Sequence, residues 1–423
     1  MTEPGNGTIA MALSGGGVRA AVFHLGALAR LAADQRLENL QVLSTVSGGS
    51  LLSAMLFQVG QREWTNSTIF RDRVMPAIRS ILTSRSMEAR WILRWPIYAP
   101  LRPLRFRGST LVAALRGAWG ITIFLDELPE SPLWIINATS YESGKSWRFT
   151  RNEMGDWKCG MYFFTSASAA DKSDSVFRVE VATAAAASAA FPYVVGMVPL
   201  RAPKKGWFDV DPTTLAPKRP NCPRAPVRKV LRLWDGGVYD NLGLEPVYKP
   251  HEGIVTRTNR GQEIRSDFLL VSDASAPLGM DLRRATGIIN PRLIPPWRMN
   301  LRMPDIATDQ TRSLRVRMVM RDIIDGSFNG ALLRLGMTAE EIKAGAISDF
   351  RRVGATTKEQ AAASYATANS LNAKEVKVVA ETPTRLSRLT SAEFARIYRH
   401  GFETCDAALC CYHPSAFIHK EYK

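Results

Sequence analysis

The apolar pattern at the start of the chain predicts a strand, a turn and a helix. Residues 8–13 form a mostly apolar run that is typical of a short buried strand. Apolar residues then return at helical spacing, at Val22, Leu25, Leu28, Ala29 and Ala32. Between them lie Gly15, Gly16 and Gly17. Their N–H groups are predicted to lie bare at the amino end of the helix, where they can stabilise a negative charge.

The same order of elements returns at residues 40–56. Residues 40–46 predict a strand, and the residues with helical spacing after it are Leu51, Leu52, Met55 and Leu56. Ser47 therefore lies at a strand-to-helix turn, followed by Gly48 and Gly49. This is the arrangement of a nucleophile elbow, which projects a serine hydroxyl above a sheet. A serine beside glycines is also common in ordinary loops, so the feature alone does not establish catalysis.

A nucleophilic serine needs a base, because its hydroxyl is almost un-ionised at neutral pH. The histidines of the chain are His24, His251, His400, His413 and His419. The last four follow the serine, as the histidine of an α/β-hydrolase triad does. None of them lies in a convincing loop at a strand end, so we interpret each as a surface or packing residue.

A carboxylate fits the role of the base better. Residues 230–234 predict a strand, and Asp235 ends it before a glycine pair that permits a sharp turn. An aspartate at the carboxyl edge of a strand can face a serine turn on a neighbouring strand. Asp235 could equally cap its own turn, and Asp240 and Asp273 are rival candidates.

Three stretches, in this order, resemble the patatin-like phospholipases, a family that includes enzymes of the cytosolic phospholipase A2 type. They are SGGGVR from residue 14, VSGGS from residue 46 and DGG from residue 235. Further matches are IINATS at 135–140, ASAAFP at 187–192 and DGGVYDNLG at 235–243. The resemblance covers roughly residues 8–280.

The resemblance implies a Ser–Asp dyad without histidine, with Ser47 as the nucleophile and Asp235 as the base. It also implies an oxyanion hole and supporting residues, which are respectively Gly15, Gly16 and Gly17, and Arg19, Gly48, Gly236 and Gly237. The mechanism is two-step acyl transfer, and it requires no metal or cofactor. An aspartate with an ordinary pKa near about 4 is a weak base, so we expect a partly dry site that raises its proton affinity.

Two positions depart from the family pattern. Thr45 stands where the elbow often has its first glycine, and Ala20 stands where a glycine often follows the basic residue of the loop. Neither position supplies a reacting atom, so the departures bear on the subfamily and the substrate.

The implied fold is α/β, with three layers in which helices cover both faces of a mostly parallel central sheet. We place the patatin-like catalytic domain at residues 8–280, with insertions at about 85–120 and 203–229. Residues 281–423 are expected to form a mainly helical extension that packs on this domain. Its clearest amphipathic helices are predicted at residues 305–324 and 391–409.

Composition points to an anionic partner. The 423 residues include 55 Lys and Arg against 39 Asp and Glu, which gives a net charge of +16. Arginine is interleaved with tryptophan at residues 90–120 and 291–303, a composition typical of a surface that meets anionic membranes. A packed cap or an oligomer interface explains it equally well. No nucleic-acid motif accompanies the charge, so we do not expect a nucleic-acid partner.

The sequence predicts a cytoplasmic protein that associates peripherally with membranes. Residues 1–7 lack the apolar core of a signal peptide, and the use of five cysteines fits a reducing compartment. The longest charge-free run, residues 181–200, is broken by Pro192, Gly196 and Pro199. We therefore expect a buried helix and turn there, and no transmembrane helix.

The expected function is hydrolysis of fatty-acyl esters in phospholipids or lysophospholipids. The alternatives are a soluble acyl esterase or thioesterase and a catalytically inactive membrane-binding protein. Because an uncontrolled phospholipase would damage its own membrane, we hypothesise that an activating effector or a homo-oligomer gates the site.

Overall fold

The structure is a computed structural model that describes residues 7–88, 108–164, 177–192, 195–258, 261–275 and 296–422, without the side chains of residues 296–304. Large parts of the two arginine- and tryptophan-rich stretches, residues 90–107 and 291–295, lie outside the described residues.

One sheet organises the described part of the chain. Its strands are β1 (Ile9–Leu13), β2 (Leu40–Val46), β3 (Leu133–Ser140), β4 (Ser146–Phe149), β5 (Glu153–Asp156), β6 (Gly160–Phe163), β7 (Val198–Arg201), β8 (Trp207–Phe208), β9 (Val230–Asp235), β12 (Phe268–Asp273) and β13 (Asn329–Arg334). A separate hairpin pairs β10 (Val255–Arg257) with β11 (Glu263–Arg265).

The strands β13, β12, β1, β2 and β3 are parallel and adjacent in that order. Every residue of β1 and β12 is buried, which is typical of parallel strands covered on both faces. These strands confirm the expected mostly parallel central sheet. Beyond β3, the strands β4, β5, β6 and β8 continue the sheet in antiparallel order, an extension that the apolar pattern did not predict.

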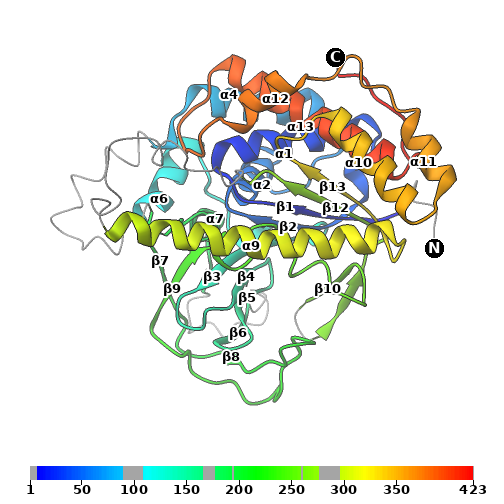
Figure 1. Cartoon of the computed structure of the whole chain (residues 1–423). Helices are drawn as coiled ribbons and strands as arrows, with labels where there is room; N and C mark the ends of the chain where they lie inside the picture. Colours follow the sequence, from blue (N-terminus) through cyan, green and yellow to red (C-terminus); the bar gives the residue numbers. More distant parts are fainter. Residues whose placement is uncertain are drawn as a thin grey trace.

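Helices cover the parallel strands. They are α1 (Gly17–Ala33), α2 (Gly48–Val59), α3 (Ser67–Ile69), α4 (Met75–Ser84), α6 (Gly108–Ala114), α7 (Val181–Ser188), α8 (Gly237–Asp240), α9 (Pro296–Ile324), α10 (Ala339–Arg352), α11 (Thr356–Ala363), α12 (Ala373–Ala380) and α13 (Ser391–Tyr412). Figure 1 shows α1, α2, α10 and α13 gathered on one side of β1, β2, β12 and β13, while α9 crosses on the other side. Within the described residues, no helix combines the length and apolar character that crossing a bilayer requires.

The carboxyl-terminal part of the chain joins the sheet that the amino-terminal part begins. Residues beyond 280 were expected to be a helical extension, yet β13 pairs in parallel with β12. The sheet therefore continues across the predicted domain boundary. Local signals still begin the helices of this part, because capping boxes at Thr338, Asn372 and Thr390 start α10, α12 and α13.

Helices α1 and α13 cross at two glycines. A Cβ on Gly26 would lie 2.1 Å from the carbonyl oxygen of Tyr398, and one on Gly401 would lie 2.0 Å from that of Phe23. The two backbones therefore pack closer than any side chain permits. Near this crossing, Nε of the fully buried Arg30 on α1 pairs with Oδ1 of Asp406 on α13 at 2.5 Å.

We predict that Gly401→Ala destabilises the protein by about 1–3 kcal/mol or more, because its methyl group would force α1 and α13 apart. Gly345→Ala is the matched control. This residue lies inside α10 with nothing within 4 Å of its added Cβ. There the substitution should be neutral or stabilising by up to about 1 kcal/mol. Urea unfolding of the two variants measures both changes, and equal stabilities would contradict the crossing.

Candidate active site

The edge of β3 brings residues from two distant segments together. Along this edge β2 pairs in parallel with β3 as far as Val46, which lies opposite Asn137. The next residue of β3, Ala138, pairs instead with Asp235 at the end of the antiparallel strand β9. Asp235 therefore occupies the ladder position that the chain vacates when it turns away from β3 at Ser47.

Ser47 lies in a strained turn between β2 and α2. Its φ of 47° and ψ of −111° are rarely adopted by a residue with a side chain, at a typical cost of about 1–3 kcal/mol. The turn is tight because Gly48 packs on the glycine loop, where an added Cβ would lie 2.4 Å from the oxygen of Gly17. Ser47 itself remains partly exposed. This is the geometry that the sequence pattern predicted for the residue.

Asp235 is a buried carboxylate with few partners. It is 4% exposed, and its Oδ1 accepts a hydrogen bond of 2.7 Å from the N–H of Gly237. The hydroxyl of Ser47 also hydrogen-bonds to its carboxylate. Burial raises the pKa of Asp235 from 3.8 to about 7, and the two hydrogen bonds oppose this only in part. The group can therefore exchange a proton near neutral pH.

The carboxyl end of α7 clamps Ser47 and Asp235 to each other. The side-chain oxygen of Ser188 accepts the N–H of Ser47 at 2.9 Å, and its carbonyl accepts the N–H of Gly236 at 3.1 Å. The carbonyl of Ala190 accepts the N–H of Asp235 at 3.0 Å. This segment fixes the serine turn and the aspartate turn in one frame.

A line of hydroxyl groups supports the clamp from behind. Ser188 contacts the hydroxyl of Ser50 at 2.8 Å, and Ser50 contacts that of Thr45 at 2.8 Å. The indole N–H of Trp134 donates to Thr45 at 2.9 Å. The threonine that departs from the family pattern is thus a link in a buried polar network, whose satisfied members rigidify the turn.

The glycine loop lies next to Ser47, but its N–H groups are not equivalent. An added Cβ on Gly15 would lie 3.1 Å from Cβ of Ser47, and the N–H of Gly15 donates to the carbonyl of Asn241 at 3.1 Å. For Gly16, Gly17 and Gly48, the described residues provide no acceptor of the N–H. The predicted set of three glycine donors narrows to Gly16 and Gly17, and Gly48 adds a third available N–H.

Arg19 points away from the serine. Its guanidinium donates to the carbonyls of Ala380 at 3.0 Å, Thr382 at 2.8 Å and Ala274 at 3.2 Å. Burial lowers its pKa to about 10, and the charge of Asp273 opposes this shift. The predicted supporting role is therefore structural: Arg19 ties the glycine loop to the segment after α12.

None of the five histidines, all of which are described, hydrogen-bonds to Ser47. His24 lies behind the glycine loop, 2.7 Å from the hydroxyl of Ser272 and 3.0 Å from the carbonyl of Ser14, and burial lowers its pKa to about 4. His400 and His413 are buried against backbone groups elsewhere. His251 is exposed and His419 pairs with Asp406.

The rival aspartates are committed to other groups. Asp240 accepts the N–H groups of Leu242 and Glu245 at 3.1 and 2.8 Å and lies 3.7 Å from Arg315. Asp273 pairs with Arg312 at 2.9 Å. Both arginines belong to α9, so these carboxylates hold that helix in place, whereas Asp235 has no ion pair among the described residues.

Two residues of the site were missed in the sequence. Asn241 accepts the N–H of Gly15 with its carbonyl, and its amide donates to Ser275 at 2.8 Å. Thr139 holds the carbonyl of Asp235 at 2.8 Å. Both lie inside stretches that resemble the family pattern, which is the signal that could have found them. The narrow space beside Gly236, where an added Cβ would lie 2.4 Å from the oxygen of Asn137, explains the glycine there.

Comparison with known proteins gives a family match and distant structural neighbours. A family model described as "patatin-like phospholipase" matches residues 11–248. Human GIVD cytosolic phospholipase A2 is 15% identical over 64% of this chain and 46% of that chain, with a TM-score of 0.41. Its complex with methyl gamma-linolenyl fluorophosphonate is 20% identical over 36% and 24%, with a TM-score of 0.28. This chain thus spans less than half the length of those chains, and no curated protein sequence matches it.

We predict that Asp235→Asn stabilises the protein at pH 8. Because the folded-state pKa of about 7 lies above the usual 3.8, folding binds a proton between these values, and stability falls as pH rises from about 4 to about 7. The amide avoids this loss and still accepts the N–H of Gly237. The gain should be on the order of 2–4 kcal/mol at pH 8 and vanish near pH 4.

Asp240→Asn is the control in urea unfolding at both pH values. Its amide nitrogen would replace one of two oxygens that each accept an N–H group, so this variant should lose stability at pH 8. A stability loss at Asp235 as large as that at Asp240 would contradict the environment described for Asp235.

Proposed function

The chain belongs to the patatin-like phospholipase family, a family of lipid acyl hydrolases, and on that premise we propose that it hydrolyses fatty-acyl esters of phospholipids or lysophospholipids at membrane surfaces. In this proposal Ser47 is the nucleophile and Asp235 the general base. The observation that carries it is the contact between the Ser47 hydroxyl and a buried carboxylate with a pKa of about 7.

The reaction begins with a proton transfer. Asp235 takes the proton of the Ser47 hydroxyl as the oxygen attacks the ester carbonyl, so the raised proton affinity of the carboxylate makes it an adequate base near neutral pH. When the tetrahedral intermediate collapses, protonated Asp235 gives the proton to the departing alcohol oxygen. In the second step it takes a proton from water, which attacks the acyl-enzyme and releases the fatty acid.

Backbone donors stabilise the oxyanion of each tetrahedral intermediate. The available N–H groups of Gly16, Gly17 and Gly48 supply them, and each donor of this kind contributes about 3 kcal/mol to the rate. Gly15 has a different role, because its N–H is bonded to Asn241 and thereby fixes the loop. The residue after the nucleophile, here Gly48, contributes to the oxyanion hole in α/β-hydrolases as well.

Apolar side chains next to the dyad support a lipid substrate. Phe191, directly after Ala190, is 50% exposed, and Val238, directly after Gly237, is 42% exposed. Large apolar side chains at this exposure near a reactive serine can receive an acyl chain or enter the membrane interface. The net charge of +16 adds attraction to anionic lipids.

We predict that Ser47→Ala and Asp235→Asn each abolish fatty-acid release from mixed anionic phospholipid vesicles, whereas His251→Ala, at an exposed position, retains it. A fluorophosphonate probe should label wild-type Ser47 and leave Ser47→Ala unlabelled. Because the base must be ionised, kcat/KM should rise with pH and level off above about pH 7.

The control outcomes separate the alternatives. An inactive His251→Ala enzyme would contradict the dyad. Hydrolysis of short soluble esters or acyl thioesters without any attack on vesicles would keep the dyad and replace the membrane substrate.

We predict that Ser188→Ala lowers kcat by about ten- to a hundredfold with little change in KM, because the Ser47 N–H loses the acceptor that positions the nucleophile. The pH midpoint should stay where it is, since Asp235 keeps both of its hydrogen bonds. Ser53→Ala is the control, because that hydroxyl is equally buried in α2 and donates to Gly49. Equal effects on kcat in the two variants would argue for a general packing role.

A further inference from the structure

A second cavity lies away from the serine, beside the β4–β5 hairpin. Its volume is about 320 Å³, and it reaches the start of β3 at Leu133 and Ile135, whereas the dyad lies past the middle of that strand. At about 3.3 Å per residue, Ile135 and Ala138 are on the order of 10 Å apart. The volume is at the low end for small-molecule sites and equals the share of about ten waters.

The cavity contains a buried carboxylate without a hydrogen-bond partner. Glu153, at the start of β5, is 2% exposed, and its Oε2 is fully buried with no donor in the described part of the chain. Leaving such a group unsatisfied costs several kcal/mol, so a fold keeps one only where something offsets the cost or function requires it. Glu153 lines the cavity, where a ligand could supply the missing donor.

The opposite charge in the same cavity is also available. Arg148 on β4 uses Nη1 to bond the carbonyl of Arg257 at 3.0 Å, and it forms no ion pair with the described residues. Its charge acts on Glu153 without forming a direct pair with it. The two groups are therefore separated partners, between which a ligand with both charges fits.

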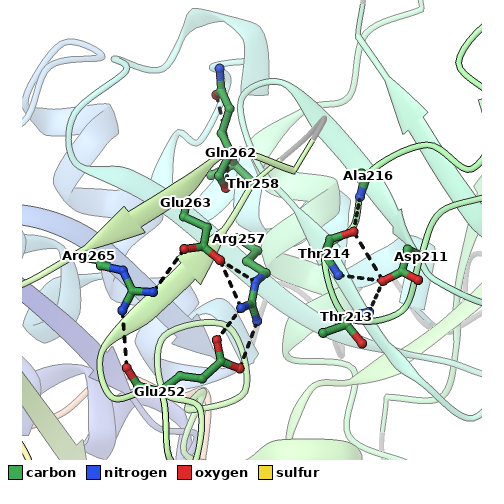
Figure 2. A network of polar contacts seen from close by, with 10 residues as sticks. All are labelled: Asp211, Thr213, Thr214, Ala216, Glu252, Arg257, Thr258, Gln262, Glu263 and Arg265. Carbon is green, nitrogen blue, oxygen red and sulfur yellow. Dashed lines mark hydrogen bonds and ion pairs between the residues drawn. The ribbon is translucent and has the colours of Figure 1, made fainter.

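The other cationic groups that line the cavity are already engaged. Figure 2 shows Arg257 between Glu252 and Glu263, which its guanidinium contacts on both sides. Arg151 donates to the carbonyl of Leu128 at 2.7 Å. Arg148 is left as the cation with spare donors at this cavity.

A neutral donor completes the pattern. The hydroxyl oxygen of Thr150 accepts the N–H groups of Asn152 and Glu153, both at 3.1 Å, and so forms the hairpin turn. Its own proton meets no acceptor among the described residues. A phosphate needs several donors for its oxygens, and here a guanidinium and a hydroxyl lie in one cavity wall.

We propose that this cavity is a second ligand site, which takes a small zwitterion of the phosphoethanolamine type, with its phosphate at Arg148 and its ammonium group at Glu153. The site is distinct from the dyad and does not depend on the proposed hydrolysis. An ammonium group supplies the hydrogen bond that Oε2 lacks, and its charge makes the ionised carboxylate favourable.

The protonation of Glu153 gives the site a further signature. Burial raises its pKa to about 7, opposed by Arg148, while Glu130, Arg151 and Arg257 are the other charged groups that line the cavity. A cationic group prefers the ionised carboxylate, so affinity should be about tenfold higher at pH 8 than at pH 6.

The first experiment is calorimetry with sn-glycero-3-phosphoethanolamine at pH 8 on the full chain carrying Ser47→Ala, so that no turnover occurs. Glu153→Gln and Arg148→Gln should each weaken binding by about tenfold or more. The choline analogue, which has no N–H, and glycerol 3-phosphate, which has no ammonium, should bind as weakly as these variants bind the probe. Glu359→Gln and Arg351→Gln, which alter an exposed ion pair on α11 and α10, should bind like the parent.

Two outcomes would overturn the proposal: no binding of the probe at pH 8, or equal binding in the parent and both cavity variants. A thermal melt of each variant shows that it is folded, and binding in the Ser47→Ala background separates this result from any failure of the proposed hydrolysis.

Vesicles distinguish the two sources of the headgroup. If an intact lipid is the ligand, Glu153→Gln should weaken binding to phosphatidylethanolamine vesicles and leave binding to phosphatidylcholine vesicles unchanged. If only the free headgroup enters, both vesicle affinities stay constant while the calorimetric affinity still falls. Either result supports the site and identifies its source.

Discussion

The register at the edge of β3 is the constraint on which the candidate active site depends. Strand β2 uses this edge up to Asn137, and β9 takes it over at Ala138. Since the two strands approach from opposite directions, the residue that leaves and the residue that arrives must meet. A shift of β9 by one residue would turn Asp235 to the other face of the sheet, because side chains alternate along a strand. The pairing of distant segments therefore sets the chemistry more than any local turn does.

The site stores free energy that the rest of the fold supplies. Ser47 has a strained backbone, and Asp235 is buried without an ion pair among the described residues. Each feature disfavours folding, yet each serves acyl transfer: strain exposes the hydroxyl, and burial makes the carboxylate a base. The large buried core of the parallel strands and the close crossing of α1 and α13 offset these costs. A site of this kind trades stability for reactivity.

Much of the parallel core could be predicted from the sequence, because its signals are local. Apolar runs identified β1, β2 and β9, and helical spacing identified α1, α2 and α13. The missed strands have no such signal. β5 contains the buried carboxylates Glu153 and Asp156 instead of an apolar face, and β13 is a short run whose strand conformation depends on pairing with β12.

The site divides along the same line. Ser47, Asp235 and the glycine loop could be picked out because each lies in a compact motif beside a predicted strand. Which N–H groups of that loop remain available could not, since the acceptor for Gly15 is Asn241, far away in sequence. Ser188 was hidden in an alanine-rich run that indicates burial and nothing more.

The two buried carboxylates, Asp235 and Glu153, show how one physical effect can serve different ends. Burial raises the pKa of both to about 7. Asp235 has a hydroxyl beside it, so its proton affinity acts on a reacting oxygen. Glu153 instead shares its cavity with a guanidinium and has a bare oxygen, so the same proton affinity favours a ligand that brings its own positive charge. Neighbours, and not the carboxylate itself, decide between catalysis and recognition.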